Sequence, residues 1–378
     1  MSAILENPVL MNIFWILVGA VIARILDEPI ERFQRRINYW SNSVISRFRG
    51  SGGLSVRQNE FRIGKWQTGW VIIEGSSSDP YTSSNVVCQI DPTPIALPPD
   101  LQQRMNAIEE QQAELEKGGK PREFHNGPIT ALASIGRGQL GYTEEPFLIL
   151  RLRPTDYYTY LATTMSLDLK TQTEQGRETT IRDKYLCNLR YEVPIPEFAG
   201  GFGVNLSVIT SDGFIIVAKR AMEGIAPYPG YICAAINECM NPILDRNVNG
   251  ALSLVVTAQR GANYELNIEI TEDEVSFFTL GVDPQNYQYV ISGLIRSKSF
   301  SRDDIISRRS IGSKERWETQ QLNFLPHDLD KIAKFLQDTS RTEKWIPTGF
   351  ACLVQTLMSE FGIRKTEQAL RKYPPLKK

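Results

Sequence analysis

The chain has 378 residues, enough for about two domains at ~100–200 residues each, and it is 42% hydrophobic and 22% charged, as expected for a chain that buries a core. Its 42 basic and 43 acidic residues give a formal net charge of -1, whereas domains that hold nucleic acid polymers by bulk electrostatics are usually basic. Five cysteines without a C-x-x-C pair and only two histidines argue against a disulfide scaffold, a structural zinc site and histidine-based metal catalysis.

The first predicted element is a membrane-spanning helix over residues 9–26 (VLMNIFWILVGAVIARIL), which are apolar or glycine except for Asn12 and Arg24. Eighteen residues at 1.5 Å each span about 27 Å, close to the ~30 Å hydrocarbon core of a bilayer. A secretory signal peptide would have a basic start and a small-residue cleavage site, but residues 1–8 carry only Glu6 as a charge and no such site follows. A buried soluble helix would not need so long an apolar run.

The charges on the two sides of this segment predict its orientation. Arginines follow it, whereas no Lys or Arg precedes it. The positive-inside rule then predicts a single-pass protein of the inner (cytoplasmic) membrane with its C-terminal domain in the cytoplasm. The alternative is a solvated helix face, because acidic residues lie among these arginines, which are Arg32, Arg35, Arg36, Arg47 and Arg49.

The next part of the chain is predicted to leave the membrane and begin the folded domain. We expect a juxtamembrane helix over 27–49 and a flexible linker at 50–53 (GSGG). Strands are expected at 54–63 and 68–74. Residues 76–100 are rich in Ser, Pro and Thr and are predicted to form a loop.

Helix-like and strand-like segments then alternate. A polar surface helix is predicted over 101–117, ending at Gly118-Gly119. After residue 124 strand-like runs are interspersed with helix-like ones, which predicts an α+β domain of about 250 residues with a mixed or antiparallel sheet. Trp317 and Trp345 are expected in the core, and 302–309 is expected to be a charged loop. The helix-like runs are 251–266, 328–338 and 348–361.

The most specific pattern lies in residues 203–268. GVNLSVITSDGFIIVAKR (203–220) predicts two strands joined by a Ser211-Asp212-Gly213 turn. After a polar insert around 241–250, residues 251–266 (ALSLVVTAQRGANYEL) place apolar side chains at helical spacing on one face. A strand is the alternative interpretation of 252–257, because β-branched residues occur there.

A hairpin, a glycine-containing loop and a helix in this order resemble the Nudix fold, whose helix carries R-E-(apolar)-x-E-E-x-G-(apolar). The corresponding stretch here is 260–268 (RGANYELNI), in which Arg260, Glu265 and both apolar positions match. The departures are Gly261 and Tyr264, where the motif has its first two glutamates, and Asn267, where it has glycine.

An upstream stretch resembles the N-terminal extension of Nudix UDP-sugar hydrolases, in which F-N-G precedes G-L-T-x-Y-x-x-x-x-G-T-N. This chain has FHNG at 124–127 and RPTDYYTYLATT at 153–164. Ala162 and Thr164 depart from the pattern. The positions that keep the spacing are Thr155, Tyr157, Tyr160 and Thr163.

The resemblance covers about residues 124–345 and implies an α+β fold class: a Nudix-like mixed sheet sandwiched by helices, with an N-terminal β-containing extension and one transmembrane helix. The alternative is an unrelated mixed sheet in which Arg260 is a surface residue. The predicted domains are a transmembrane anchor (1–26), a juxtamembrane helix and linker (27–53), an N-terminal extension (54–123) and a Nudix-like domain (124–378).

The departures from the motif bear on catalysis. A Nudix helix hydrolyses a diphosphate with carboxylates three to four residues apart that hold Mg²⁺ against phosphate oxygens. Only Glu265 remains in the motif, and nothing in the sequence places Glu238 or Glu269 beside it. The resemblance therefore implies a nucleotide pocket with weak or absent hydrolysis, no catalytic residue and no cofactor. Glu265 would be a residual metal ligand, and only a hydrolase would require Mg²⁺.

Six residues are predicted to bind the ligand. Arginine pairs with phosphate bidentately, lysine supplies a point charge, and tyrosine rings suit the stacking of a base. The simpler alternatives are a solvated rim for the basic residues, ordinary packing for the tyrosines and a tight turn at Asn126-Gly127. The predicted ligand-binding residues are Lys219, Arg220, Arg260, Tyr157, Tyr160 and Asn126.

A single span joined to a degenerate Nudix-like domain resembles the membrane-Nudix effectors of bacterial cyclic-oligonucleotide antiphage systems (CBASS). This resemblance implies a cytoplasmic receptor for a nucleotide second messenger, a cyclic oligonucleotide, which forms a homo-oligomer and disrupts the lipid bilayer. No nucleic acid polymer is expected as a partner. The alternatives are a membrane-tethered Nudix hydrolase of nucleoside diphosphate sugars and an anchored scaffold that binds another protein.

Overall fold

The computed structural model describes residues 60–120, 122, 124–140, 145–173, 175–187, 189–222 and 228–376. Residues 59–378 form one compact unit. The predicted membrane span at 9–26, the juxtamembrane helix and the linker lie outside the described residues.

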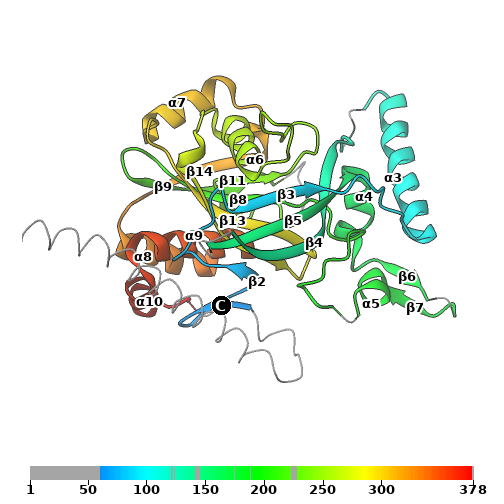
Figure 1. Cartoon of the computed structure of the whole chain (residues 1–378), viewed down its shortest axis with the longest axis horizontal. Coiled ribbons are helices and arrows are strands. Elements are labelled where there is room, and N and C mark those ends of the chain that lie inside the picture. Colours follow the sequence, from blue (N-terminus) through cyan, green and yellow to red (C-terminus); the bar gives the residue numbers. More distant parts are fainter. Residues whose placement is uncertain are drawn as a thin grey trace, which may run out of the picture. The chain divides into compact units, whose positions relative to one another are not determined.

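The unit is built on a nine-stranded mixed sheet (Figure 1). Its main path is β1-β2-β12-β13-β8-β9-β10, with β11 paired to β8 and β14 paired to β9. β13 and β8 run parallel, and the other neighbouring strands run antiparallel. The strands are β1 (Glu60–Ile63), β2 (Trp66–Gly75), β8 (Gly203–Ile209), β9 (Phe214–Arg220), β10 (Ile232–Ala234), β11 (Ile236–Cys239), β12 (Val275–Asp283), β13 (Gln288–Arg296) and β14 (Thr319–Pro326).

A smaller sheet and the helices complete the described structure. The smaller sheet has the order β3-β5-β4, with β3 parallel to β5. Its strands are β3 (Val86–Ile90), β4 (Pro128–Leu140) and β5 (Glu145–Asp156), and a separate hairpin joins β6 (Lys170–Gln172) to β7 (Glu178–Thr180). The helices are α3 (Pro99–Lys117), α4 (Tyr157–Ala162), α5 (Ile181–Tyr185), α6 (Leu254–Gly261), α7 (Arg302–Gly312), α8 (Leu329–Thr342), α9 (Pro347–Phe361), α10 (Ile363–Lys372), the π-helix η4 (Ala262–Leu266) and the 3-10 helices η3 (Thr164–Ser166), η5 (Glu272–Glu274) and η6 (Arg316–Glu318).

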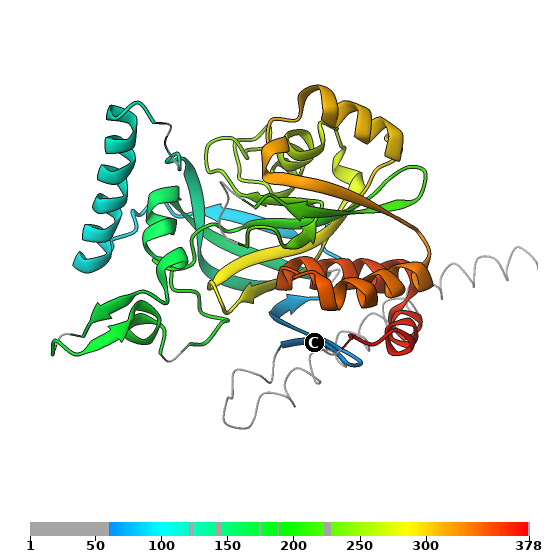
Figure 2. The ribbon, with the colours of Figure 1, turned by 180° about the vertical axis from the view of Figure 1, so that it is seen from behind.

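The nine-stranded sheet separates two hydrophobic cores. Side chains alternate along a strand, so the neighbours Phe277 and Phe278 of β12 are both fully buried but enter different cores. Phe277 packs in the core that contains the smaller sheet and α6, whereas Phe278 packs in the core that contains α8, α9 and α10. Figure 2 shows the three C-terminal helices together on their side of the sheet.

The hairpin and helix predicted at 203–266 are confirmed. β8 and β9 pair antiparallel across a turn closed by the Thr210 N–H, which donates to the Phe214 carbonyl at 2.8 Å. Gly213 in this turn has φ +80°, a conformation that glycine adopts without strain. The Ser253 side chain caps α6 by accepting from the Val256 N–H, so the strand alternative for 252–257 is wrong.

The predicted fold class, a Nudix-like mixed sheet sandwiched by helices with one transmembrane helix, is wrong. The nine-stranded sheet is not sandwiched by helices, because the β3-β5-β4 sheet shares the coverage of one face with α6. Among the residues that the structure describes, no helix combines the length and the apolar character needed to cross a membrane. The class itself is α+β with a mixed sheet.

Three local predictions also need correction. The predicted loop at 76–100 contains β3, which gains its hydrogen bonds from β5. The predicted charged loop at 302–309 is helical, because Ser301 and Asp304 form a capping box at the start of α7. Trp317 is 58% exposed and is not a core residue.

Candidate functional site

The hairpin β8–β9 ends on two basic residues that point to opposite faces of the sheet, because adjacent side chains of a strand alternate. The Lys219 ammonium lies on the face of α8 and donates to both carboxylate oxygens of Glu343, at 3.0 and 2.8 Å. Arg220 points to the other face and is only 8% exposed. Lys219 and Arg220 therefore do not serve the same site.

Arg220 lies within electrostatic reach of two tyrosines of α4. Burial, together with the charges of Cys239 and Glu318, raises the pKa of Tyr157 to about 12, and the positive charge of Arg220 opposes this rise. Burial likewise raises the pKa of Tyr160, and Arg220 again opposes the rise. The two tyrosine rings lie 5.6 Å apart between centroids. We call Arg220, Tyr157 and Tyr160 the arginine–tyrosine site.

Within the described part of the chain, the Arg220 Nε atom is buried and has no hydrogen-bond partner. No carboxylate there lies within ion-pair distance of its guanidinium, although Arg220 does lower the raised pKa of Glu318. A buried donor without a partner costs about 1–3 kcal/mol. This arginine is therefore a candidate for binding an anion.

Asn126 supports the site without facing it. Its Oδ1 atom accepts the Tyr158 N–H at 3.0 Å, and the Asp156 carboxylate accepts the Thr159 N–H at 2.9 Å. Both bonds satisfy N–H groups in the first turn of α4, which have no partner within the helix itself. Asn126 is exposed and acts as a cap that fixes the position of Tyr157.

Four glutamates from three parts of the chain gather next to this site, and we call them the glutamate cluster. Burial raises the pKa of all four, and repulsion from other members of the cluster adds to the rise for Glu238, Glu265 and Glu315, whereas the charge of Arg220 opposes it for Glu318. The cluster members are Glu238 of β11, Glu265 of η4, Glu318 of η6 and Glu315, which immediately precedes η6. Each keeps part of its surface exposed. The Glu265 carboxylate is oriented by the Asn237 N–H, which donates to it at 2.8 Å.

The packing around α6 accounts for the residues at positions 261 and 267. A Cβ at Gly261 would lie 2.6 Å from Ile236 Cγ2 and 3.1 Å from Glu238 Cβ, so this position has no room for a glutamate. Glu238 of the neighbouring strand lies there instead. Asn267 ends η4 in the left-handed conformation at φ 56°, which glycine takes most readily and asparagine next.

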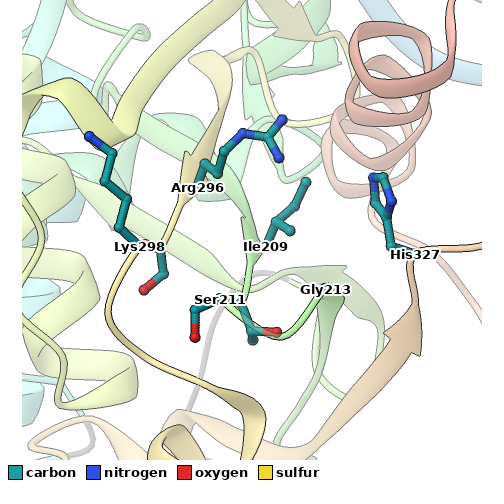
Figure 3. Close-up of a pocket in the computed structure, with 8 residues that line it drawn as sticks. Ile209, Ser211, Gly213, Arg296, Lys298 and His327 are labelled. Carbon is teal, nitrogen blue, oxygen red and sulfur yellow. The ribbon is translucent and has the colours of Figure 1, made fainter.

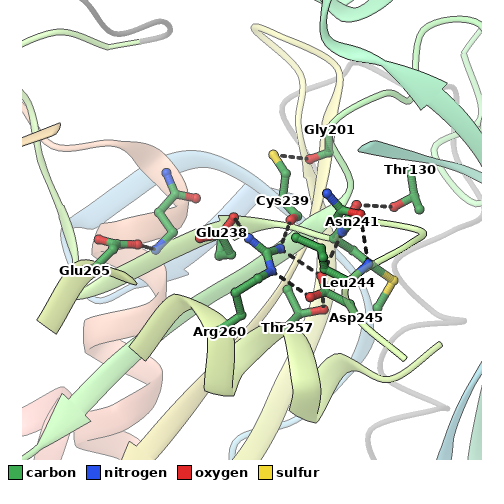
Figure 4. Close-up of polar contacts among 12 residues, drawn as sticks. Thr130, Gly201, Glu238, Cys239, Asn241, Leu244, Asp245, Thr257, Arg260 and Glu265 are labelled. Carbon is green, nitrogen blue, oxygen red and sulfur yellow. Dashed lines mark hydrogen bonds and ion pairs between the residues drawn. The ribbon is translucent and has the colours of Figure 1, made fainter. Parts of the chain in front are cut away.

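Arg260 forms an internal clamp (Figure 4). Its Nε and Nη2 atoms donate to the two carboxylate oxygens of Asp245 at 2.7 and 2.8 Å, Nη1 donates to Glu238 at 2.7 Å, and Nη2 also donates to the Cys239 carbonyl at 2.7 Å. Burial lowers the pKa of Arg260, but the bonds to Asp245 and the charge of Glu238 outweigh it and raise the pKa overall. The guanidinium is therefore largely engaged within the protein.

The structure thus brings together three of the six predicted ligand-binding residues, which are Tyr157, Tyr160 and Arg220. It places Lys219 on the opposite face, Asn126 in a helix cap and Arg260 in a clamp. Sequence reasoning missed Glu315 and Glu318, whose i, i+3 spacing beside Trp317 was a visible but weak signal.

The chemistry available is the binding of an anion by a buried arginine, beside carboxylates that can accept protons. Among the described residues, no group of three or more His, Cys, Asp or Glu side chains has an arrangement that could hold a metal ion. The glutamate cluster would need to rearrange before it could do so.

No protein-family model matches the sequence, and no curated protein matches it. Among solved structures, the chain is similar to DR0079 from Deinococcus radiodurans, with 14% sequence identity, 50% of this chain and 96% of that chain covered, and a TM-score of 0.25. A similarity at this level carries no argument about fold or function.

Proposed function

We propose that the protein is a receptor that binds a nucleotide second messenger, a cyclic oligonucleotide, at the arginine–tyrosine site. The observation that supports this proposal is the buried Arg220 guanidinium, whose Nε lacks a hydrogen-bond partner in the described part of the chain. A phosphate group would supply the missing acceptor, because arginine pairs with phosphate through parallel N–H bonds.

Tyr157 gives the site a preference for a ligand with rings, whereas Tyr160 is only 2% exposed and packs behind it. Tyr157 is half-buried and lies beside Phe124 at 6.1 Å and Tyr160 at 5.6 Å between ring centroids. Stacking of a base on an aromatic side chain contributes ~1–3 kcal/mol. A phosphate next to a flat ring is the chemistry of a nucleotide.

The test compares two substitutions at adjacent positions of β9. Full-length protein is titrated calorimetrically with cyclic dinucleotides and trinucleotides. Arg220→Gln should weaken binding about 10–100-fold, since a charge-assisted bond contributes ~1.5–3 kcal/mol. Lys219→Gln removes the same charge on the opposite face and is the matched control, which should bind within about twofold of the wild type.

Equal affinities of wild type and Arg220→Gln would overturn the proposed site. If no cyclic oligonucleotide binds the wild type at millimolar concentration, the receptor function itself is wrong. A loss of binding with Lys219→Gln but not with Arg220→Gln would move the ligand to the α8 face.

A second candidate is hydrolysis of nucleoside diphosphate sugars, and the glutamate cluster favours it. The carboxylates missing from the motif helix are replaced in its neighbourhood by glutamates from β11 and η6. The assay is release of sugar phosphate by full-length protein with Mg²⁺ and UDP-sugars. Turnover that Glu265→Gln abolishes would favour the hydrolase over the receptor.

Membrane attachment, self-association and bilayer disruption stay predictions from the sequence. Residues 9–26 and their flanks lie outside the described residues. Fractionation of cells into soluble and membrane pools tests the predicted inner-membrane location. Light scattering with and without a cyclic oligonucleotide tests the predicted homo-oligomer.

A further inference from the structure

A separate pocket lies at the other end of the hairpin from Arg220 (Figure 3). Its volume is about 370 Å³, and its floor is formed by Ile209 at the end of β8 and Arg296 at the end of β13. These two residues pair in the parallel β8–β13 ladder, so the two strands end side by side. Beyond the strand ends the two segments stay hydrogen-bonded, since the Ser297 N–H donates to the Ile209 carbonyl at 2.8 Å and the Ser211 N–H donates to the Phe300 carbonyl at 2.9 Å, and the pocket lies beside them.

The ionisable side chains that line the pocket in the described structure are all basic: Arg296, Lys298 and His327. Arg296 is 52% exposed and Lys298 is 58% exposed, so both charges can meet a ligand from solvent. Each also pairs with a carboxylate, Glu360 for Arg296 and Asp273 for Lys298. Hydroxyl groups of the hairpin turn add neutral hydrogen-bonding atoms to the wall.

Glu360 holds one side of the pocket in place. The side chain of this α9 residue is only 6% exposed, and its carboxylate accepts hydrogen bonds from Arg296 Nη2 and, at 3.0 Å, from His327 Nε2. The His327 ring also lies against Phe361, 4.6 Å between centroids. The two basic side chains are therefore fixed from beneath before any ligand arrives.

Arg296 retains most of its binding capacity. A guanidinium has five N–H groups, and the described contacts of Arg296 use one of its nitrogens, Nη2. A planar guanidinium with free N–H groups, and an ammonium on another part of the pocket wall, can each bind oxygens of a phosphate or a carboxylate.

We propose that this pocket binds a small polyanion that carries phosphate or carboxylate groups, held by Arg296 and Lys298. Its volume is at the lower end of the ~300–1,000 Å³ typical of ligand pockets, which fits a compact metabolite. The site is independent of the arginine–tyrosine site, because Arg220 is the last residue of β9 whereas Gly213 lies in the turn just before that strand begins.

The test titrates full-length protein with pyrophosphate and with citrate at low ionic strength. Binding of either probe supports the proposal, and the probe that binds identifies the ligand as a phosphate or a carboxylate. Lys298→Gln and Arg296→Gln should each weaken binding about tenfold or more, as expected for loss of a charge-assisted bond. Lys331→Gln is the matched control, because this α8 lysine is 69% exposed and does not line the pocket.

A folding control and the choice of variant make the result decisive. Melting curves show whether each variant is folded, and Lys298→Gln tests the pocket without disturbing the bonds to Glu360. Failure of both probes to bind the wild type at millimolar concentration would overturn the proposal. Unchanged affinity in both pocket variants would also overturn it, as would binding that only Arg220→Gln abolishes. This last variant separates the pocket from the arginine–tyrosine site.

Discussion

Replacing Arg260 by methionine should destabilise the protein strongly. Methionine keeps the length of the side chain but removes every hydrogen bond to Asp245, Glu238 and the Cys239 carbonyl. Asp245 is fully buried, so its carboxylate would be left in the interior without a positive partner. Removing one member of a buried ion pair typically costs ~3–5 kcal/mol.

The free-energy loss translates into a measurable shift in melting temperature. For a chain of this size about 1 kcal/mol corresponds to ~2 °C, so Arg260→Met should melt ~6–10 °C below the wild type. The Thr257 hydroxyl and the Asn241 N–H also donate to Asp245, at 3.0 and 2.7 Å, and an amide oxygen can accept both bonds. The double variant Arg260→Met/Asp245→Asn removes the unpaired charge and should recover part of the loss.

Thermal unfolding of the full-length protein, followed by near-ultraviolet circular dichroism, provides the assay. Lys170→Met breaks an ion pair whose partners are 75% and 67% exposed, so it should leave the melting temperature unchanged. An Arg260→Met protein that melts within 2 °C of the wild type would refute the reasoning, at the ~2 °C per kcal/mol used above. So would a double variant less stable than Arg260→Met.

Substitutions at three other positions test the surroundings of the site. Gly261→Ala should destabilise the fold by ~1–3 kcal/mol in urea unfolding, because the new Cβ would lie 2.6 Å from Ile236 Cγ2. Asn267→Ala should lower the melting temperature more than Asn267→Gly, since both lose the bond to the Arg308 carbonyl but only alanine is strained at φ 56°. Burial and neighbouring charge raise the pKa of Glu315 from 4.5 to about 7, so the folded form holds a proton that the unfolded form releases in this range. Stability should therefore fall as pH rises through that window, and Glu315→Gln should flatten the fall measured by urea unfolding at pH 5 and 7.

Local patterns predicted the hairpin and α6 well, because a tight turn and a helix are determined by residues that are close together in the sequence. Side chains alternate between the two faces of a strand. Lys219 and Arg220 are adjacent in β9 and therefore point to opposite faces, which the sequence alone already implies. The prediction that both residues bind the same ligand overlooked this alternation. The Ser301–Asp304 capping box of α7 was likewise present in the sequence.

The glutamate cluster was beyond sequence reasoning for a different reason. Glu315 and Glu318 approach Glu265 because β14 pairs with β9, a contact that depends on the whole sheet. Similarly, β3 lies in a stretch rich in turn-forming residues, and its strand conformation comes from its partner β5. Strand propensity reflects such context more than the residues themselves.

The position of β2 has a consequence for how the chain is made. Its partner β12 follows about two hundred residues later, so β2 leaves the ribosome long before it can complete its hydrogen bonds. Trp70, fully buried in the finished protein, is exposed to the cell during that interval. Translation that stalls before residue 283 leaves this apolar strand paired only with β1 and with its other edge free, which is the kind of segment that aggregates or recruits chaperones.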